Sequence, residues 1–200
     1  MFLQRDVKVQ ILETAQPLFL QHGFNKVSIN QITDSIGISK KTFYKHYESK
    51  EALVLRIIES NIRDAALKMN KLHSSTKISY VTKMEKLMHI TMDFQSKFSK
   101  IFMQDIHKYM PDIITKFEES SRVLIKDNFT VLLKQGKEAN VFRKDIDTNF
   151  FVDIYFFIIQ KLQDPKTLSN VTYSLNDLHK LITKILFEGI LTDEGRKSES

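Results

Sequence analysis

The stretch SINQITDSIGISKKTFYKHY, residues 28–47, predicts two short helices joined by a tight turn. Ser28 and Gln31 have the spacing of a capping box, in which the two side chains satisfy the first free N–H groups of a helix. Gly37 supplies the positive φ that the turn needs, and Ser39 is an N-cap for the second helix. This pattern is typical of a helix-turn-helix motif.

The second helix of the motif has one narrow apolar side and a large polar surface. Phe43 and Tyr47 alone share the apolar side, because side chains four residues apart lie on the same face of a helix. Four lysines stand against the single acidic residue Glu48 between residues 40 and 50, which gives this stretch a net charge of +3, half of the chain's +6. Positive charge concentrated in this way suits contact with phosphate groups. The side chains available to a DNA groove are Lys40, Lys41, Thr42, Tyr44, Lys45 and His46.

Helical periodicity continues outside the motif. Apolar residues recur at three- and four-residue steps, and five Gly and three Pro in 200 residues favour long helices. Pro17 is expected to kink the first helix. Because no stretch shows strand alternation, we predict an all-α chain of about nine helices. The helices expected outside the motif span residues 7–22, 50–72, 80–98, 100–108, 112–137, 150–162 and 175–191, with a connection at Asp164-Pro165 and a polar, disordered tail at 193–200.

Composition excludes several classes of protein. Without cysteine the chain has no disulfide framework, thiolate metal cluster or cysteine nucleophile, and it suits a reducing cytoplasm, where we expect it. We expect the charged start, Met1 to Asp6, to be neither a signal peptide nor an anchor. The most apolar run, Phe150 to Leu162, contains Asp153 and is shorter than the ~20 residues of a membrane span. We therefore expect no membrane partner, and the positive net charge suits nucleic acid.

An enzyme or a metal site has little support in the sequence. There is no glycine-rich phosphate loop and no nucleophile elbow. Asp105 and His107 are two residues apart, so they do not share a helical face, and no two histidines have the His-x3-His spacing of a zinc site. We predict no catalytic residues, no metal and no cofactor.

A stripe of methionine and aromatic residues follows in the middle of the chain. Such a stripe is more often core than ligand pocket, although methionine adapts well to ligands of different shape. The residues leave both interpretations open and do not identify individual pocket side chains. The stripe consists of Met84, Met88, Met92, Phe94, Phe98, Phe102, Met103, Tyr109, Met110 and Phe117.

Residues 5–55 resemble the DNA-binding domain of the TetR family in the order, spacing and class of their side chains. A charged helix face is usually only a solvated surface, but this match favours the DNA-binding interpretation. It covers about a quarter of the chain, and the rest resembles the family only in helical character and length. The matching runs are Ala15 to Phe19, His22 to Phe24, Val27 to Ile29, Ile32, Ile36 to Ser39, Thr42 to Tyr44, His46-Tyr47 and Ser49 to Leu53.

The resemblance implies a role for each side chain of the motif. Ser28 and Lys50 match helix N-termini that approach the DNA backbone, where the helix dipole favours phosphate. Ser39 is a cap whose phosphate contact would be additional. Lysine donates to guanine O6 and N7, and a threonine methyl meets a thymine methyl. Positions that match base contacts are Lys41, Thr42 and Lys45, those that match phosphate contacts are Tyr44 and His46, and Lys40 suits either.

The resemblance also implies an architecture. Residues 1–50 would form a three-helix DNA-binding head and residues 51–192 a helical-bundle body that binds an effector and dimerises. Helices 150–162 and 175–191 would join two copies over a palindromic operator. A small apolar or aromatic effector would then release a repressor from double-stranded operator DNA. Two alternatives stay open: an activator or architectural factor controlled by a protein partner, and, more distantly, a helical-bundle enzyme.

Overall fold

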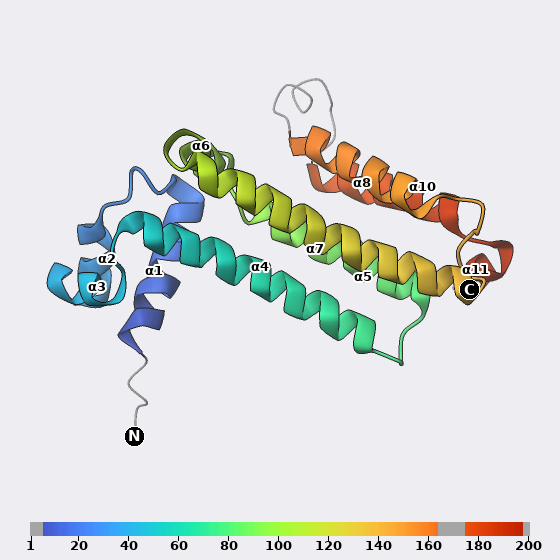
Figure 1. The fold of residues 1–200 in the computed structure, drawn as a ribbon, viewed down its shortest axis with the longest axis horizontal. Helices are drawn as coiled ribbons and strands as arrows, with labels where there is room; N and C mark the ends of the chain where they lie inside the picture. Colours follow the sequence, from blue (N-terminus) through green and yellow to red (C-terminus); the bar gives the residue numbers. More distant parts are fainter. Residues whose placement is uncertain (1–5, 164–174, 198–200) are drawn as a thin grey trace. The chain divides into compact units, whose positions relative to one another are not determined.

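The computed structural model describes residues 6–163 and 175–197, and over these residues the chain is all-α, as the sequence predicts (Figure 1). The nine expected helices are present within the described ranges, together with one more near the C-terminus. The expected connection at Asp164-Pro165 lies outside the described residues. The helices are α1 (Val7–His22), α2 (Ile29–Ile36), α3 (Lys40–His46), α4 (Lys50–Ser74), α5 (Tyr80–Ser96), α6 (Lys100–Tyr109), α7 (Pro111–Glu138), α8 (Thr148–Gln163), α10 (Leu175–Ile190) and α11 (Asp193–Lys197).

Short-range signals in the sequence set the ends of the first helices. Ser28 and Gln31 form the expected capping box at the start of α2. Gly37 ends α2 with φ 68° and ψ 35°, a left-handed conformation that favours glycine. The Ser39 hydroxyl accepts the N–H of Thr42 at 3.1 Å and so caps α3. The predicted turn and caps are therefore confirmed.

The chain divides into two compact units. The first contains residues up to 65 and residues 93–121, which include α1, α2, α3, the start of α4, α6 and the start of α7. Its core includes Ile11, Phe19, Ile32, Phe43 and Leu53, all fully buried. This unit holds the expected head together with part of the expected body. The functional boundary at residue 50 stays a prediction.

The second unit contains residues 66–92 and the described residues from 122 onward. The Phe129 and Tyr155 rings join α7 to α8 in its core, with their centroids 4.8 Å apart. Helix α10 packs beside α8 (Figure 1). Met84, Met88 and Met92 of the stripe lie in this unit, with Met84 and Met88 fully buried, whereas the other residues of the stripe lie in the first unit.

The C-terminal residues differ from the expectation. The polar sequence predicts a disordered tail at 193–200, but residues 193–197 form α11. Thr192 caps this helix by accepting the Gly195 N–H at 2.9 Å, and Gly195 is buried. This helix cannot be predicted from its polar composition, because its stability comes from contacts with distant residues and not from an apolar stripe.

Within the described ranges, every helix is too short or too polar to cross a lipid bilayer.

Candidate nucleic-acid interface

Two aromatic side chains hold α3 against the rest of the first unit. Phe43 is fully buried, and Tyr47 at the end of α3 is 5% exposed. The Tyr47 hydroxyl donates to the carbonyl oxygen of Lys8 at 3.1 Å, which ties the end of α3 to α1. Burial is also the main reason that the pKa of Tyr47 is raised. The orientation of α3 therefore follows from the side chains that the sequence analysis placed on its apolar face.

The opposite side of α3 presents polar and basic groups to solvent. Lys40, Lys41, Tyr44 and Lys45 are exposed, and Thr42 and His46 are half-buried. Within the described ranges, the ammonium groups of the three lysines make no hydrogen bond or ion pair. The fold thus leaves these charges available to an external anion.

The first turns of α2 and α4 lie next to this surface along the chain. Ser28 is exposed, and its hydroxyl and backbone N–H are both engaged with Gln31. Lys50, the first residue of α4, is half-buried and donates through Nζ to the carbonyl oxygens of Asn25 and Val27, at 3.3 and 3.2 Å. An ammonium group has three donors, so a third remains for phosphate.

The Lys50 ammonium also lies over an aromatic ring. Its Nζ is 5.6 Å from the centroid of Phe24, within the range of a cation–π interaction. The family resemblance implies only a contact with the DNA backbone for Lys50. The structure adds a second role, because the same side chain connects the start of α4 to the loop between α1 and α2.

Helix α6 contacts the same loop from another side. The Asn25 N–H donates to Asp105 Oδ2 at 2.9 Å, and the Asn25 side-chain amide donates to the Tyr109 hydroxyl at 3.3 Å. The Tyr109 ring meets the Phe24 ring edge to face, with centroids 6.2 Å apart. Sequence reasoning missed these residues, since about 80 positions separate the partners and no local pattern connects them.

A cluster of four aromatic rings lies next to this contact, on α5, α6, α7 and the connection between α5 and α6. Phe98 contacts Phe94, Phe102 and Phe117 at centroid distances of 5.5, 5.9 and 4.9 Å. Phe94, Phe102 and Phe117 are buried, whereas Phe98 is only half-buried. Part of the stripe is therefore packed aromatic core, and Phe98 links that core to solvent.

Comparison with known proteins decides the family. Residues 11–57 match the family model described as bacterial regulatory proteins of the tetR family. The head of the chain is that of a TetR-family transcriptional regulator. As such it binds DNA, and its relatives act in transcription and are not enzymes, so the helical-bundle enzyme is excluded.

Three relatives of this TetR-family regulator extend the match beyond the head. It is 23% identical over 188 residues to the HTH-type transcriptional regulator YvaF of Bacillus subtilis, which covers 92% of this chain and 96% of YvaF. It is 23% identical over 151 residues to the HTH-type transcriptional repressor KstR2 of Rhodococcus jostii, 70% of each chain.

The crystal structure of the third relative supports the fold. A transcriptional regulator from Saccharomonospora viridis in complex with choline superposes with a TM-score of 0.75 at 18% identity. The alignment covers 94% of this chain and all of that one. The TetR-family fold therefore extends over nearly the whole regulator.

Proposed function

We propose that this regulator is a homodimeric repressor that binds a near-palindromic operator and is released by a small-molecule effector. The observation that carries the proposal is α3, a capped and anchored helix whose exposed lysines have no partner among the described residues. A helix with these properties fits the major groove, where each half-site would receive one copy.

Side chains on α3 have two different tasks in this proposal. Lys41, Thr42 and Lys45 contact base edges and so determine the sequence that is bound. The other groups position the helix through phosphates without reading sequence. The phosphate group comprises Ser28, Ser39, Lys40, Tyr44, His46 and Lys50.

The proposed dimer joins two copies through α8 and α10. Phe150 and Phe157, seven residues apart on α8, are 65% and 60% exposed. Leu181 and Ile185, four apart on α10, are 47% and 69% exposed. Spacings of four and seven residues place each pair on one face of its helix. A second copy that covers these faces would bury four large apolar side chains on each chain and place two heads on one operator.

The effector site that we propose is the ring cluster around Phe98. A small apolar or aromatic molecule that enters between these rings would displace Phe102, which lies on α6. The same helix carries Asp105 to the loop before α2, so a shift of α6 would change the position of the head. Effector and operator would then favour different conformations and weaken each other's binding. The choline complex of the Saccharomonospora viridis protein supports a small-molecule site in this fold.

Selection of bound sequences from a random DNA pool tests the DNA-reading part of the proposal. The wild-type protein should enrich a palindrome, and the Lys41→Ala/Lys45→Ala variant should lose base preference at one position of each half-site, at a cost of roughly 1 to 3 kcal/mol per bidentate contact. Lys68→Ala/Lys71→Ala on α4 removes the same charge from exposed positions and should leave the selected sequence unchanged. An affinity loss spread evenly over all sequences would contradict base readout.

The effector part needs its own test. A ligand library is screened by thermal shift, and each hit is added to the complex with the selected operator. Release of the DNA, absent in a Phe98→Ala variant, is the expected result. If no ligand changes operator affinity, release by a small molecule is wrong, and control by a protein partner replaces it.

A further inference from the structure

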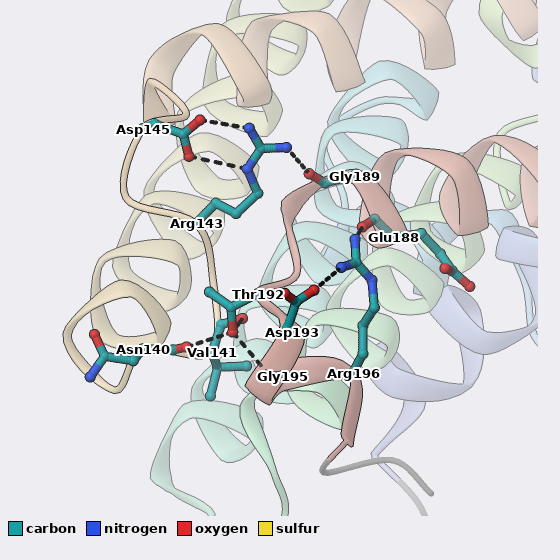
Figure 2. Close-up of polar contacts among 10 residues, drawn as sticks. All are labelled: Asn140, Val141, Arg143, Asp145, Glu188, Gly189, Thr192, Asp193, Gly195 and Arg196. Carbon is teal, nitrogen blue, oxygen red and sulfur yellow. Dashed lines mark hydrogen bonds and ion pairs between the residues drawn. The ribbon is translucent and has the colours of Figure 1, made fainter.

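The end of α10 is fastened to the connection between α7 and α8. The Thr192 hydroxyl donates to the carbonyl oxygen of Asn140 at 2.7 Å and accepts the Gly195 N–H at 2.9 Å (Figure 2). The Thr192 N–H donates to the carbonyl oxygen of Val141 at 3.0 Å. One residue thus caps α11 and binds the backbone of a segment about 50 positions earlier. We call this arrangement the C-terminal clasp. It consists of Thr192 to Arg196, Arg143 and the residues that they contact.

Two arginines complete the clasp at the last turn of α10. Arg143 donates through its backbone N–H to the carbonyl oxygen of Ile190 at 2.8 Å and through Nη1 to that of Gly189 at 3.2 Å. Arg196 donates through Nη2 to the carbonyl oxygen of Glu188 at 3.0 Å. Three carbonyl groups that the helix itself leaves unpaired therefore have partners, and the positive charges lie at the negative end of the helix dipole.

Each arginine is itself held by a carboxylate. Asp145 accepts from Nε and Nη2 of Arg143 at 3.1 and 2.6 Å, and Asp193 accepts from Nη1 of Arg196 at 3.0 Å (Figure 2). The paired donors of Arg143 fix its planar guanidinium group in one orientation. That orientation directs the remaining Nη1 donor toward α10.

Close packing leaves little freedom for the clasp to slide. A Cβ atom added at Gly195 would lie 2.5 Å from the carbonyl oxygen of Val141, so no larger residue fits without a shift of the backbone. The Phe142 ring is fully buried and meets Phe187 of α10 at a centroid distance of 6.3 Å. Phe142 and Leu191 also pair as an isolated antiparallel bridge. Hydrogen bonds and packing therefore fix the same end of α10.

We infer that the C-terminal clasp positions α10 against α8 so that their exposed apolar residues form one dimer surface. This inference rests on the proposed dimer. A rotation of α10 by one residue turns its side chains by about 100°, and a slide of one residue moves them by 1.5 Å, so small displacements separate Leu181 and Ile185 from the surface of α8. The clasp opposes both movements, since it joins the end of α10 to the segment that leads into α8.

The test measures the dimer dissociation constant of the full chain by sedimentation equilibrium, with thermal melting in parallel. Thr192→Val keeps the side-chain shape but removes the hydroxyl, and it should weaken the dimer at least tenfold. Thr192→Ser restores the hydroxyl and should restore the wild-type constant. Gly37→Ala is the matched control, because it strains the left-handed turn of the head and lowers the melting temperature without touching the clasp.

The possible outcomes separate the clasp from the dimer. If the wild type is dimeric and Thr192→Val has the same dimer dissociation constant, the inferred role of the clasp is wrong and the proposed dimer remains. A wild type that stays monomeric at high concentration overturns both. If Thr192→Val does not fold, Arg143→Gln, which removes the guanidinium bond to Gly189, replaces it under the same criteria.

Discussion

Lys50 has an internal role in the structure, where it contacts the loop between α1 and α2, and a predicted role as a phosphate contact. Replacement of Lys50 by methionine separates these two roles. Methionine keeps an unbranched apolar stem and removes the ammonium group. The lost contacts are two hydrogen bonds to carbonyl oxygens, at 3.3 and 3.2 Å, and the approach to the Phe24 ring at 5.6 Å. Each hydrogen bond contributes about 0.5 to 1.5 kcal/mol and an exposed cation–π contact about 0.5 to 1 kcal/mol. We expect a loss of roughly 1.5 to 4 kcal/mol in the free energy of unfolding.

This loss corresponds to a decrease in melting temperature of about 3 to 16 °C for a chain of this size. Differential scanning calorimetry measures it without DNA. Operator affinity is then measured across a salt series, where a lost phosphate contact reduces the slope of log K against log salt by about one unit for each half-site.

Lys50→Arg is the control for the charge, because arginine keeps the positive charge with a different donor geometry. It should retain the salt slope and lose part of the stability. A methionine variant that melts at the wild-type temperature would refute the internal role of Lys50. An unchanged salt slope in that variant would refute the phosphate contact.

Two further predictions follow from polar groups in the two units. Burial lowers the pKa of His73, and its Nδ1 has no hydrogen-bond partner in the described part of the chain, so the neutral ring is the stable form in the folded protein. Stability should therefore fall as the pH drops from about 6.5 through the lowered pKa, and His73→Gln should remove that part of the slope in urea titrations at several pH values. Asp105→Ala leaves the Asn25 N–H without its acceptor and should weaken operator binding by roughly fivefold to tenfold, equivalent to about 1 kcal/mol, without a change of selected sequence. Asp105→Asn keeps an acceptor, and if it binds as weakly as the alanine variant, the hydrogen bond is not the cause.

Local patterns predicted most of the secondary structure because the relevant interactions lie within one or two helical turns. The Ser28 capping box, the Gly37 turn and the Ser39 cap each depend on residues at most four positions apart. Burial of Phe43 and Tyr47 followed from helical spacing in the same way. The assignment of individual side chains to bases or phosphates stays a prediction, since it depends on how the head docks on DNA.

Contacts between distant residues could not be predicted from such patterns. Nothing near Asn25 indicates that Asp105 accepts its N–H, and nothing near Lys50 indicates two carbonyl acceptors in an earlier loop. The helix at 193–197 is the clearest case. Its composition is typical of a tail, and its order comes from Thr192 and from a glycine that packs against residue 141.

The way in which α3 is anchored has a consequence for how this regulator acquires new operators. Its fold depends on Phe43, Tyr47 and the Ser39 cap, while the ammonium groups of Lys40, Lys41 and Lys45 hydrogen-bond to nothing in the described structure. Substitutions at these three positions therefore cost little stability, because exposed sites without partners usually change the free energy of unfolding by less than about 0.5 kcal/mol. DNA preference can then diverge between descendants of one gene before any compensating change in the core. Because the residues that stabilise α3 are not the residues proposed to contact DNA, a library randomised at the three lysines could direct the protein to other operators.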